Sequence, residues 1–569
     1  MEYRVLRRFC SPLSLKRIDP AKTMKLAIRG LPEEVFQVTG IDTAGALKTQ
    51  GSVTVVYVKQ GGENVCRREP VLEQHQGKEK TMTINYVCLS DMHLGQDNSL
   101  LTNLVQADAA LDHSDASPVL KALCKGLREL ISLANAGTGV KPVLILNGDI
   151  LELALADVND AAMVFRHFLD CLMPKGNEIF SDVIYIPGNH DHHLWEMARE
   201  TQYVEYLKED FPDPLPPPWH TTNLFMGDKP PLVSYFLNGV IRHYDKSSPI
   251  SVKMVYPNLG IRDESKQRYV IFNHGHYIES IYLLMTEVMS LIFPDRDKPV
   301  EVWDFEKENF AWIDFFWSVM GRSGSAGSKV EAIYEALPVE KARNKLISNL
   351  CASLAKKYDL PGWGDWMEEK MLEKILIGLA EYLAKSERSQ TDGPLSDDAR
   401  KGLWQYLEGP LRRQLLGFLK EDQNQTDEKK LVFPKAITFV FGHTHKPYQE
   451  DEDFGGYPVW VDIYNTGGWV VESVTREPIK GASVVLFDEK LYSTSLRLYN
   501  EADTASSYRV QVVQASPQGQ GAAGYSFHAA IQVIVNTMGA TWDEFSQETA
   551  RAVDIRAKHL KAKLARTAG

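Results

Sequence analysis

Five short polar motifs, each following an apolar run, constrain the fold of this chain more than any other feature. The motifs are Asp91-Met92-His93, Gly148-Asp149-Ile150-Leu151-Glu152, Gly188-Asn189-His190-Asp191, His274-Gly275-His276 and Gly442-His443-Thr444-His445. Near-continuous apolar runs, such as 143–146 and 437–441, are typical of strands that are buried on both faces. Ligands in such sheets bind beyond the carboxyl ends of the strands, which is where all five motifs lie. The sequence therefore predicts an α/β fold with its functional residues at that end of the strands.

Helices are predicted between the early strands, at 119–134 and 161–172, and in a long segment before the fifth motif. Residues 277–432 are too many for a plain connection, and we expect a helical insertion there, packed on or over the site. Its apolar residues recur at helix spacing in two stripes, the second interrupted at Pro410. The stripes are Leu372, Ile375, Leu376, Leu379 and Leu383, and Trp404, Leu407, Leu411, Leu415 and Leu419.

These patterns divide the chain into four predicted parts. Residues 1–82 form an N-terminal accessory region, in which the β-branched run 53–58 is predicted to be a strand. Residues 83–276 and 433–500 form the catalytic domain, and 277–432 form the insertion. Residues 501–569 form a C-terminal extension with a short apolar run, Ile531 to Asn536, that could be a helix or a strand. A basic helical tail is expected at 550–565.

Charge and cysteine content limit the partners and the compartment of the protein. The formal net charge of −12 over 569 residues is opposite to the basic balance of most proteins that bind nucleic acid, which argues against a nucleic-acid substrate. The six cysteines are scattered, which favours free thiols in a reducing cytosol. The basic N-terminus lacks the apolar stretch of a signal peptide, and no run is long enough to span a membrane. We expect a cytoplasmic protein, either soluble or peripheral to a membrane.

The spacing within the motifs is suited to metal binding. Residues two apart in extended chain point the same way, so Asp91 and His93 can reach one metal ion. His443 and His445 have the same spacing and could reach two neighbouring ions. Asp149 is the natural bridge between them, because a carboxylate has two oxygens. Carboxylate, imidazole and amide ligands together suit Mn²⁺, Fe²⁺ or Zn²⁺.

The five motifs, in this order, resemble those of the calcineurin-like metallophosphoesterase superfamily. The match covers roughly residues 83–275 and 433–500 and implies a four-layer αββα sandwich of helices on two facing sheets. The resemblance implies a first metal held by Asp91, His93, Asp149 and His445, and a second held by Asp149, Asn189, His274 and His443. His274 is preferred to His276 because it comes first after the strand.

The resemblance also implies the reaction, which is hydrolysis of a phosphoester with two divalent metal ions as cofactors. Two cations can acidify a bridging water, so that the resulting hydroxide attacks phosphorus, and they can neutralise the phosphoryl oxygens. His190 would donate a proton to the leaving oxygen. Asp191 is grouped with His190 as a catalytic residue. Asp191 and Glu152 would also orient His190 and the loop that carries Asp149.

The substrate is expected to be a phosphorylated small molecule or a lipid-like one. No Arg follows Asp149, unlike in the protein phosphatases of this superfamily, and Glu152 stands where purple acid phosphatases need a Tyr. The runs 91–95 and Asn465-Thr466-Gly467-Gly468-Trp469 look more like the branch containing UDP-2,3-diacylglucosamine hydrolase, which cleaves a pyrophosphate bond in a lipid-linked nucleotide.

The aromatic stretches of the insertion, 277–293 and 305–320, would be core or an apolar surface for lipid and peripheral membrane contact. Two alternatives remain open: a phosphodiesterase or phosphatase acting on a soluble nucleotide, and a non-catalytic metal-bound scaffold.

Overall fold

The computed structural model divides the chain into two compact units, residues 1–81 and 82–569. It describes residues 83–567, with gaps at 209–213, 215–216, 227–231, 245, 247, 249, 320–392 and 516–520, and five strands of the first unit. Those strands form one antiparallel sheet in the order β1 (Thr23–Leu26), β2 (Glu34–Ile41), β3 (Leu47–Gln50), β4 (Val53–Gln60) and β5 (Glu63–Pro70). The β-branched run at 53–58 therefore lies in a strand, as predicted.

The second unit is a mixed α/β fold with two mixed sheets. The larger sheet has the order β18 (Gln511–Val513), β17 (Ser493–Asn500), β16 (Gly481–Phe487), β6 (Tyr86–Leu89), β7 (Val143–Asn147), β8 (Asp182–Ile186), β10 (Val252–Met254) and β9 (Leu232–Val233). The smaller sheet has the order β11 (Asn258–Arg262), β12 (Arg268–Asn273), β13 (Ala436–Phe441), β15 (Val461–Asn465) and β14 (Tyr448–Glu452).

The five motifs follow parallel strands of these sheets. Strands β6, β7 and β8 pair in parallel, and so do β12 and β13, while the flanking strands β16 and β11 pair antiparallel to them. Because the carboxyl ends of parallel strands meet at one edge of a sheet, each sheet presents its motif residues at a single edge.

Facing apolar side chains join the two sheets. Cys88 and Ile145 of the larger sheet belong to the same buried cluster as Val270, Phe272 and Val440 of the smaller one. All five are fully buried or nearly so, and burial of a side chain of the size of Val or Phe stabilises a fold by roughly 1.5–3 kcal/mol. This core explains why the apolar runs before the motifs carry so few polar residues.

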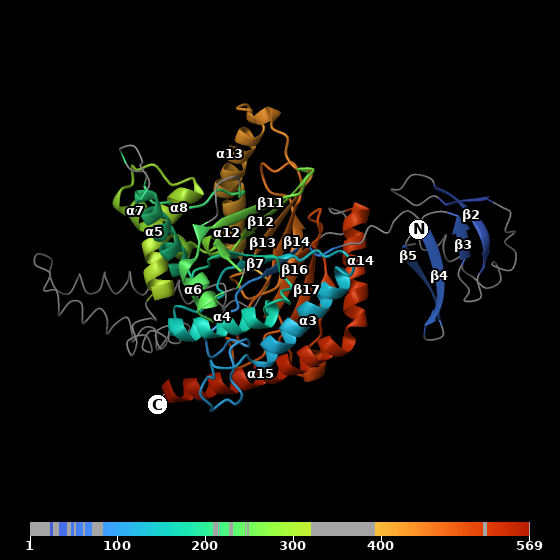
Figure 1. Ribbon diagram of the computed structural model, residues 1–569. Coiled ribbons are helices and arrows are strands. Elements are labelled where there is room, and N and C mark those ends of the chain that lie inside the picture. The colour runs from blue at the N-terminus through green and yellow to red at the C-terminus, as the bar shows by residue number, and fades with distance from the viewer. Residues whose placement is uncertain are drawn as a thin grey trace, which may run out of the picture. The chain divides into compact units, whose positions relative to one another are not determined.

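The opposite face of the larger sheet packs against α3 (Pro118–Ala134), α4 (Val158–Leu172), α14 (Gly521–Thr537) and α15 (Gly539–Thr567). Figure 1 shows α3, α4 and α15 on the same side of the strands. The side chain of Ser117 caps α3 by accepting a hydrogen bond from the N–H of Leu120, and Pro118 starts the helix. Helix α14 includes Ile531 to Asn536, so that run is helical.

The described part of the insertion covers the free face of the smaller sheet. It begins with η1 (His276–Ile278), η2 (Ser280–Leu283), α7 (Leu284–Ile292), α8 (Val302–Ile313) and the π-helical η3 (Asp314–Val319). It ends with α12 (Asp397–Tyr406), the π-helical η7 (Leu407–Leu411) and α13 (Arg412–Asp422). Leu403, Leu411 and Leu415 pack in one cluster with Ile437 and Phe439 of β13.

Pro410 does not end the helix that carries the second apolar stripe. It lies within η7, between α12 and α13, so the helical path continues from residue 397 to 422. A proline has no N–H to donate and its ring crowds the preceding turn, and a single wider turn can accommodate both effects. The first stripe, at 372–383, lies outside the described residues.

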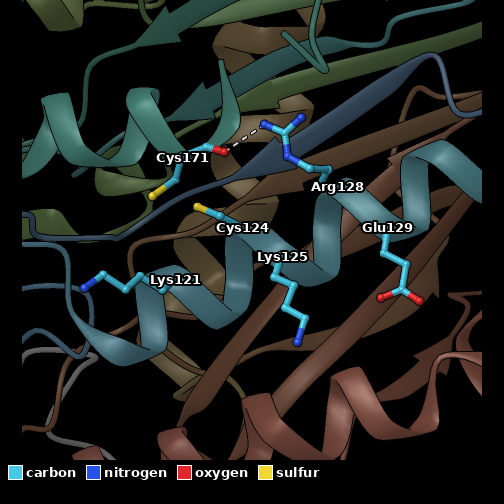
Figure 2. A pocket seen from close by; sticks show the side chains of 6 residues that line it. All are labelled: Lys121, Cys124, Lys125, Arg128, Glu129 and Cys171. Carbon is cyan, nitrogen blue, oxygen red and sulfur yellow. Dashed lines mark hydrogen bonds between the residues drawn. The ribbon is translucent and has the colours of Figure 1, made fainter. Parts of the chain in front are cut away.

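Two cysteines of adjacent helices face one another. Cys124 of α3 and Cys171 of α4 line a pocket with Lys121, Lys125, Arg128 and Glu129. Figure 2 shows the two sulfur atoms pointing toward each other, and the Arg128 guanidinium donates a hydrogen bond of 2.9 Å to the Cys171 carbonyl. Cys88, Cys124 and Cys171 are free thiols.

None of the described helices combines the length and the apolar character that a membrane span requires.

Candidate metal centre

The loops after β6, β7, β8, β12 and β13 bring the motif residues together at one buried place. Two groups of three residues could each hold a metal ion, because the ligand atoms within each group all lie within 4.8 Å of one another. The groups are Asp91, His93 and His445, and Asp149, His274 and His443. A further group of His93, Asp149 and His190 overlaps both. Residues far apart in the sequence are thus assembled into a single buried centre.

Five of these residues have a left-handed backbone, which non-glycine residues rarely adopt. They are Asp91, His93, Asp149, His443 and His445, with φ between 45° and 68°. Only three other described non-glycine residues have a positive φ. The left-handed conformation costs roughly 1–2 kcal/mol per residue. Concentration of this strain at one place is typical of a functional site.

Glycines beside these residues make room for the ligand side chains. Gly148 has φ 86°, and a Cβ at this position would overlap the ring of His274. A Cβ on Gly442 would overlap the carboxylate of Asp91. At both positions the close approach of a neighbouring side chain requires glycine.

The first group presents two imidazole nitrogens to each other. His93 Nε2 lies 3.2 Å from His445 Nε2 and 3.7 Å from Asp149 Oδ2. His445 Nε2 in turn lies 3.4 Å from Asp91 Oδ1. Two nitrogens and two carboxylate oxygens at these distances form a donor set suited to a cation such as Mn²⁺, Fe²⁺ or Zn²⁺.

Asp149 belongs to the second group and also lies near His93 of the first. His274 Nε2 lies 3.3 Å from Asp149 Oδ2 and 3.1 Å from Asn189 Oδ1. The other ring nitrogen of His274 faces the carbonyl of Asn147 at 3.2 Å. Asn189 therefore lies with this group, at the position expected from the sequence. His276 lies outside both groups, with its Nε2 3.2 Å from the hydroxyl of Tyr256.

Carboxylates hold the outer nitrogens of three of the histidines. His93 Nδ1 lies 2.8 Å from Glu152 Oε2, and His445 Nδ1 lies 2.9 Å from Glu472 Oε1. His443 Nε2 lies 2.6 Å from Glu279 Oε1, which leaves Nδ1 as the nitrogen that can reach a metal. Histidines that bind metals almost always engage their second nitrogen in this way, because the contact fixes the tautomer and the ring orientation.

Sequence reasoning missed Glu279 and Glu472, because neither lies in a motif. Glu279 is three residues after His276, and Glu472 is three residues after Trp469. Lys480 Nζ lies 2.7 Å from Glu472 Oε2 and holds that carboxylate in turn. The sequence places Glu279 near the fourth motif and Glu472 near the run 465–469, but this nearness does not distinguish either residue from its neighbours.

His190 lies beside the first group and is held by Glu152. Its Nδ1 is 2.9 Å from Glu152 Oε1, and its backbone N–H donates a 2.8 Å hydrogen bond to Asp149 Oδ1. Glu152 thus positions both His93 and His190. Its Oε1 also accepts from the N–H groups of Ala154 and Leu155, at 2.9 Å each.

Asp191, which the sequence groups with His190, makes its hydrogen bonds to the second and third motifs and to β8. Its oxygens accept hydrogen bonds from the N–H groups of Ile150 at 2.7 Å and Gly188 at 2.6 Å, and from the hydroxyl of Tyr185. Asp191 therefore fastens the loop that follows Asp149, and Glu152 is the carboxylate that contacts the ring of His190.

The electrostatics of the centre favour deprotonated carboxylates. Burial alone would raise the pKa of Asp149, but His274, His190 and His93 lower that pKa well below its usual range. Burial likewise opposes ionisation of Glu152, but His190 and His93 lower its pKa to about 2. Burial lowers the pKa of His93 to about 4, which leaves this imidazole neutral, as a metal ligand must be.

The pKa values of Asp191 and His274 reflect the negative charge of the clustered carboxylates. Burial and the nearby Asp149 raise the pKa of Asp191 to about 6. Burial lowers the pKa of His274, but Asp149 and Asp91 outweigh it and raise that pKa to about 9. Without a cation, the protonated imidazole of His274 balances this charge. A divalent cation fits the same place, because it would supply the positive charge and displace that proton.

The insertion covers the centre. Ser318 of η3 donates a 2.6 Å hydrogen bond to the carbonyl of Asn189. The ring of Trp317 lies 6.4 Å from that of His190, and the ring of Tyr282 lies 5.2 Å from that of His443. His190 is the most exposed of these motif residues and is still only 4% exposed. A substrate would have to be bounded on this side by the insertion.

A comparison with protein-family models finds no match for the chain, and a comparison with curated protein sequences finds no significant match. The centre itself combines carboxylate, imidazole and amide groups that converge, are buried, lie in part on strained backbone and are held from outside by further carboxylates.

Proposed function

We propose that the protein is a metal-dependent phosphoesterase of the calcineurin-like metallophosphoesterase superfamily, with a four-layer αββα sandwich. Seven motif residues would hold two divalent cations, with Asp149 shared between the two ions. These ligands are Asp91, His93, Asp149, Asn189, His274, His443 and His445. A pair of such cations supplies acidification of a water and neutralisation of phosphoryl oxygens.

One observation carries the proposal: the histidines of the centre are arranged as metal ligands. Each presents one nitrogen to Asp91 or Asp149 and has the other held by an acceptor. If both neutral rings donate through Nδ1 to their carboxylates, the two Nε2 atoms that face each other at 3.2 Å carry only lone pairs, and a cation between them would satisfy both.

The protein's own residues would contribute positioning and proton transfer. His190 is held by Glu152 beside the shared Asp149, where its ring could donate a proton to the leaving oxygen of a phosphoester. Asp191 would keep the loop after Asp149 in place through its backbone hydrogen bonds. The covering insertion would limit access of bulk water, which strengthens electrostatic interactions within the site.

A test of this function separates metal binding from chemistry. We expect Asp149→Asn to lose bound metal, and with it the hydrolysis of bis-p-nitrophenyl phosphate. His190→Ala should keep its metal and lose about 10²–10⁴-fold in rate, the usual contribution of a general acid. Asp108→Asn, at an exposed position, is the matched control. Unchanged metal content and rate in Asp149→Asn would sink the proposal.

A lipid-like substrate, such as a lipid-linked nucleotide with a pyrophosphate bond, is a second candidate. Apolar side chains of the insertion favour it, because Phe293 and Phe315 are 54% and 61% exposed. Tyr282 and Trp317 also place aromatic rings beside the centre. Co-sedimentation with phosphatidylcholine–phosphatidylglycerol vesicles tests the idea. Efficient cleavage of soluble nucleotides with no vesicle binding would favour a soluble substrate instead.

A further inference from the structure

A separate group of buried metal-ligating side chains lies between α5 (His193–Leu207) and the insertion. It consists of His192, at the amino end of α5, Glu196, in the first turn of that helix, and Glu306, on α8. The three ligand atoms lie within 4.8 Å of one another. His192 and Glu306 are fully buried, and Glu196 is 7% exposed. Because His192 and Glu196 are four residues apart, they lie on the same face of the helical turn.

The two carboxylates are each held by one oxygen. Glu196 Oε2 accepts from Arg199 Nε at 2.8 Å and Nη2 at 2.6 Å. Glu306 Oε2 accepts from the hydroxyl of Tyr256 at 3.0 Å and from the hydroxyl of Tyr277. One oxygen of each carboxylate is thereby oriented, and these donors leave the second oxygen of each unengaged. Metal ligands are commonly oriented by outer hydrogen bonds of this kind.

His192 and Glu306 pair with each other, but one oxygen of Glu196 is left without a hydrogen-bond partner in the described part of the chain. His192 Nε2 lies 2.9 Å from Glu306 Oε1, and its other nitrogen lies 3.7 Å from Asp314 Oδ1. Glu196 Oε1 is buried and has no hydrogen-bond partner within the described part of the chain. A buried carboxylate oxygen without a partner is unfavourable, because it has lost its hydration and gained nothing in exchange.

We propose that His192, Glu196 and Glu306 bind one further divalent metal ion, which fastens the insertion to α5. One imidazole and two carboxylates form a donor set that suits Mn²⁺, Fe²⁺ or Zn²⁺. The ion satisfies Glu196 Oε1 and joins a residue directly after the third motif to helix α8. Its position is distinct from the candidate centre, since none of its three ligands belongs to the groups described there.

The test measures the number of metal ions bound per chain in a variant that lacks ligands of the candidate centre. The background variant is Asp149→Asn with His445→Ala, which removes ligands from both groups of the centre. After chelation, loading with Mn²⁺ and desalting, we expect about one ion per chain in this background and about none when Glu196→Gln is added. Mn²⁺ should also raise the melting temperature of the background variant and not that of the triple variant.

The controls keep this proposal separate from the proposed function. Glu200→Gln changes an exposed residue one turn further along α5 and should leave the Mn²⁺ count unchanged. Glu306→Gln should lower the count as Glu196→Gln does, and circular dichroism would verify that both variants are folded. A background variant that is folded and binds no Mn²⁺ overturns the third site, whatever the wild type binds. A failure of the proposed function would appear instead as equal metal counts in wild type and background.

Discussion

Glu279 Oε1 lies 2.6 Å from His443 Nε2, so a residue of the insertion holds a histidine of the fifth motif. The two residues are 164 positions apart in the chain. Glu279 lies between η1 and η2, three residues after the fourth motif. The insertion is therefore part of the structure that orients the candidate metal centre, and a change in its position would be felt at His443.

Substitution of Glu279 should weaken metal binding without removing a ligand. In Glu279→Gln the ring of His443 loses its charged acceptor, and loss of such a partner typically lowers metal affinity about 10–100-fold. Titration of the metal-free protein with Mn²⁺ would measure this change. Glu287→Gln, at an exposed position of α7, is the matched control and should bind Mn²⁺ as the wild type does. Equal affinities for wild type and Glu279→Gln would contradict a positioning role.

The sequence was sufficient to predict the strands before the motifs and the residues that follow them. A near-continuous apolar run such as that before Gly148 has few alternatives to a buried strand, and the polar residues after it must lie at the strand end. The structure places Asp91, Asp149, His274 and His443 at such ends.

The backbone strain and the outer partners of the histidines could not be predicted in the same way. The left-handed conformation of Asp149 depends on Gly148, on the ring of His274 and on the hydrogen bonds that Asp191 makes with the next residues. These are contacts between distant segments, and no local pattern encodes them. Asp191 illustrates the difficulty, because it accepts hydrogen bonds from Ile150 and Leu151, about forty residues earlier in the sequence.

The C-terminal extension supports the loop after the first motif through a buried arginine. Arg556 of α15 is 2% exposed and donates to the carbonyls of Ser99 at 2.9 Å, Leu104 at 3.1 Å and Thr102. Ser99 in turn donates from its hydroxyl to the carbonyl of Met92 at 2.7 Å. This chain of contacts gives residues 501–569 a role that the sequence left open.

Arg556→Met should destabilise the protein because it leaves these buried carbonyls without a donor. The loss expected from several charge-assisted hydrogen bonds is on the order of 3 kcal/mol in the free energy of unfolding. Chemical denaturation monitored by circular dichroism would measure it. Arg551→Met, at an exposed position of the same helix, should change the free energy by no more than about 0.5 kcal/mol. A similar small change in Arg556→Met would show that the carbonyls find other donors.

The thiols of Cys124 and Cys171 should differ in reactivity although they face each other. A hydrogen bond from Cys124 lowers the pKa of Cys171, whereas burial raises the pKa of Cys124 well above its usual range. Since the thiolate is the reactive form, iodoacetamide should modify Cys171 about tenfold faster or more at neutral pH. Peptide mapping by mass spectrometry of the native protein would give both rates. Cys88, which is fully buried, should remain unmodified, and equal rates for Cys124 and Cys171 would contradict the assignment.

The contact between Asp97 and His559 should make stability depend on pH. His559 Nε2 lies 3.1 Å from Asp97 Oδ2, and its Nδ1 lies 2.7 Å from the carbonyl of Ala107, so both nitrogens can donate only in the protonated ring. The hydrogen bond to Asp97 raises the pKa of His559 above its ordinary value of 6.5. Burial raises the pKa of Asp97, but His559 and Lys563 outweigh it and lower that pKa to about 2, from 3.8.

The signs of the two shifts define the pH range of this contribution. The raised pKa of His559 stabilises the folded state below pH 6.5, and this is lost as the pH rises through the folded value. The lowered pKa of Asp97 stabilises the folded state above pH 3.8, and this is lost as the pH falls through about 2. His559→Gln should therefore reduce the free energy of unfolding more at about pH 5.5 than at about pH 9. In the Asp97→Asn background the same substitution should lose this pH dependence, and a pH-independent difference in the parent protein would show that the two side chains are not coupled.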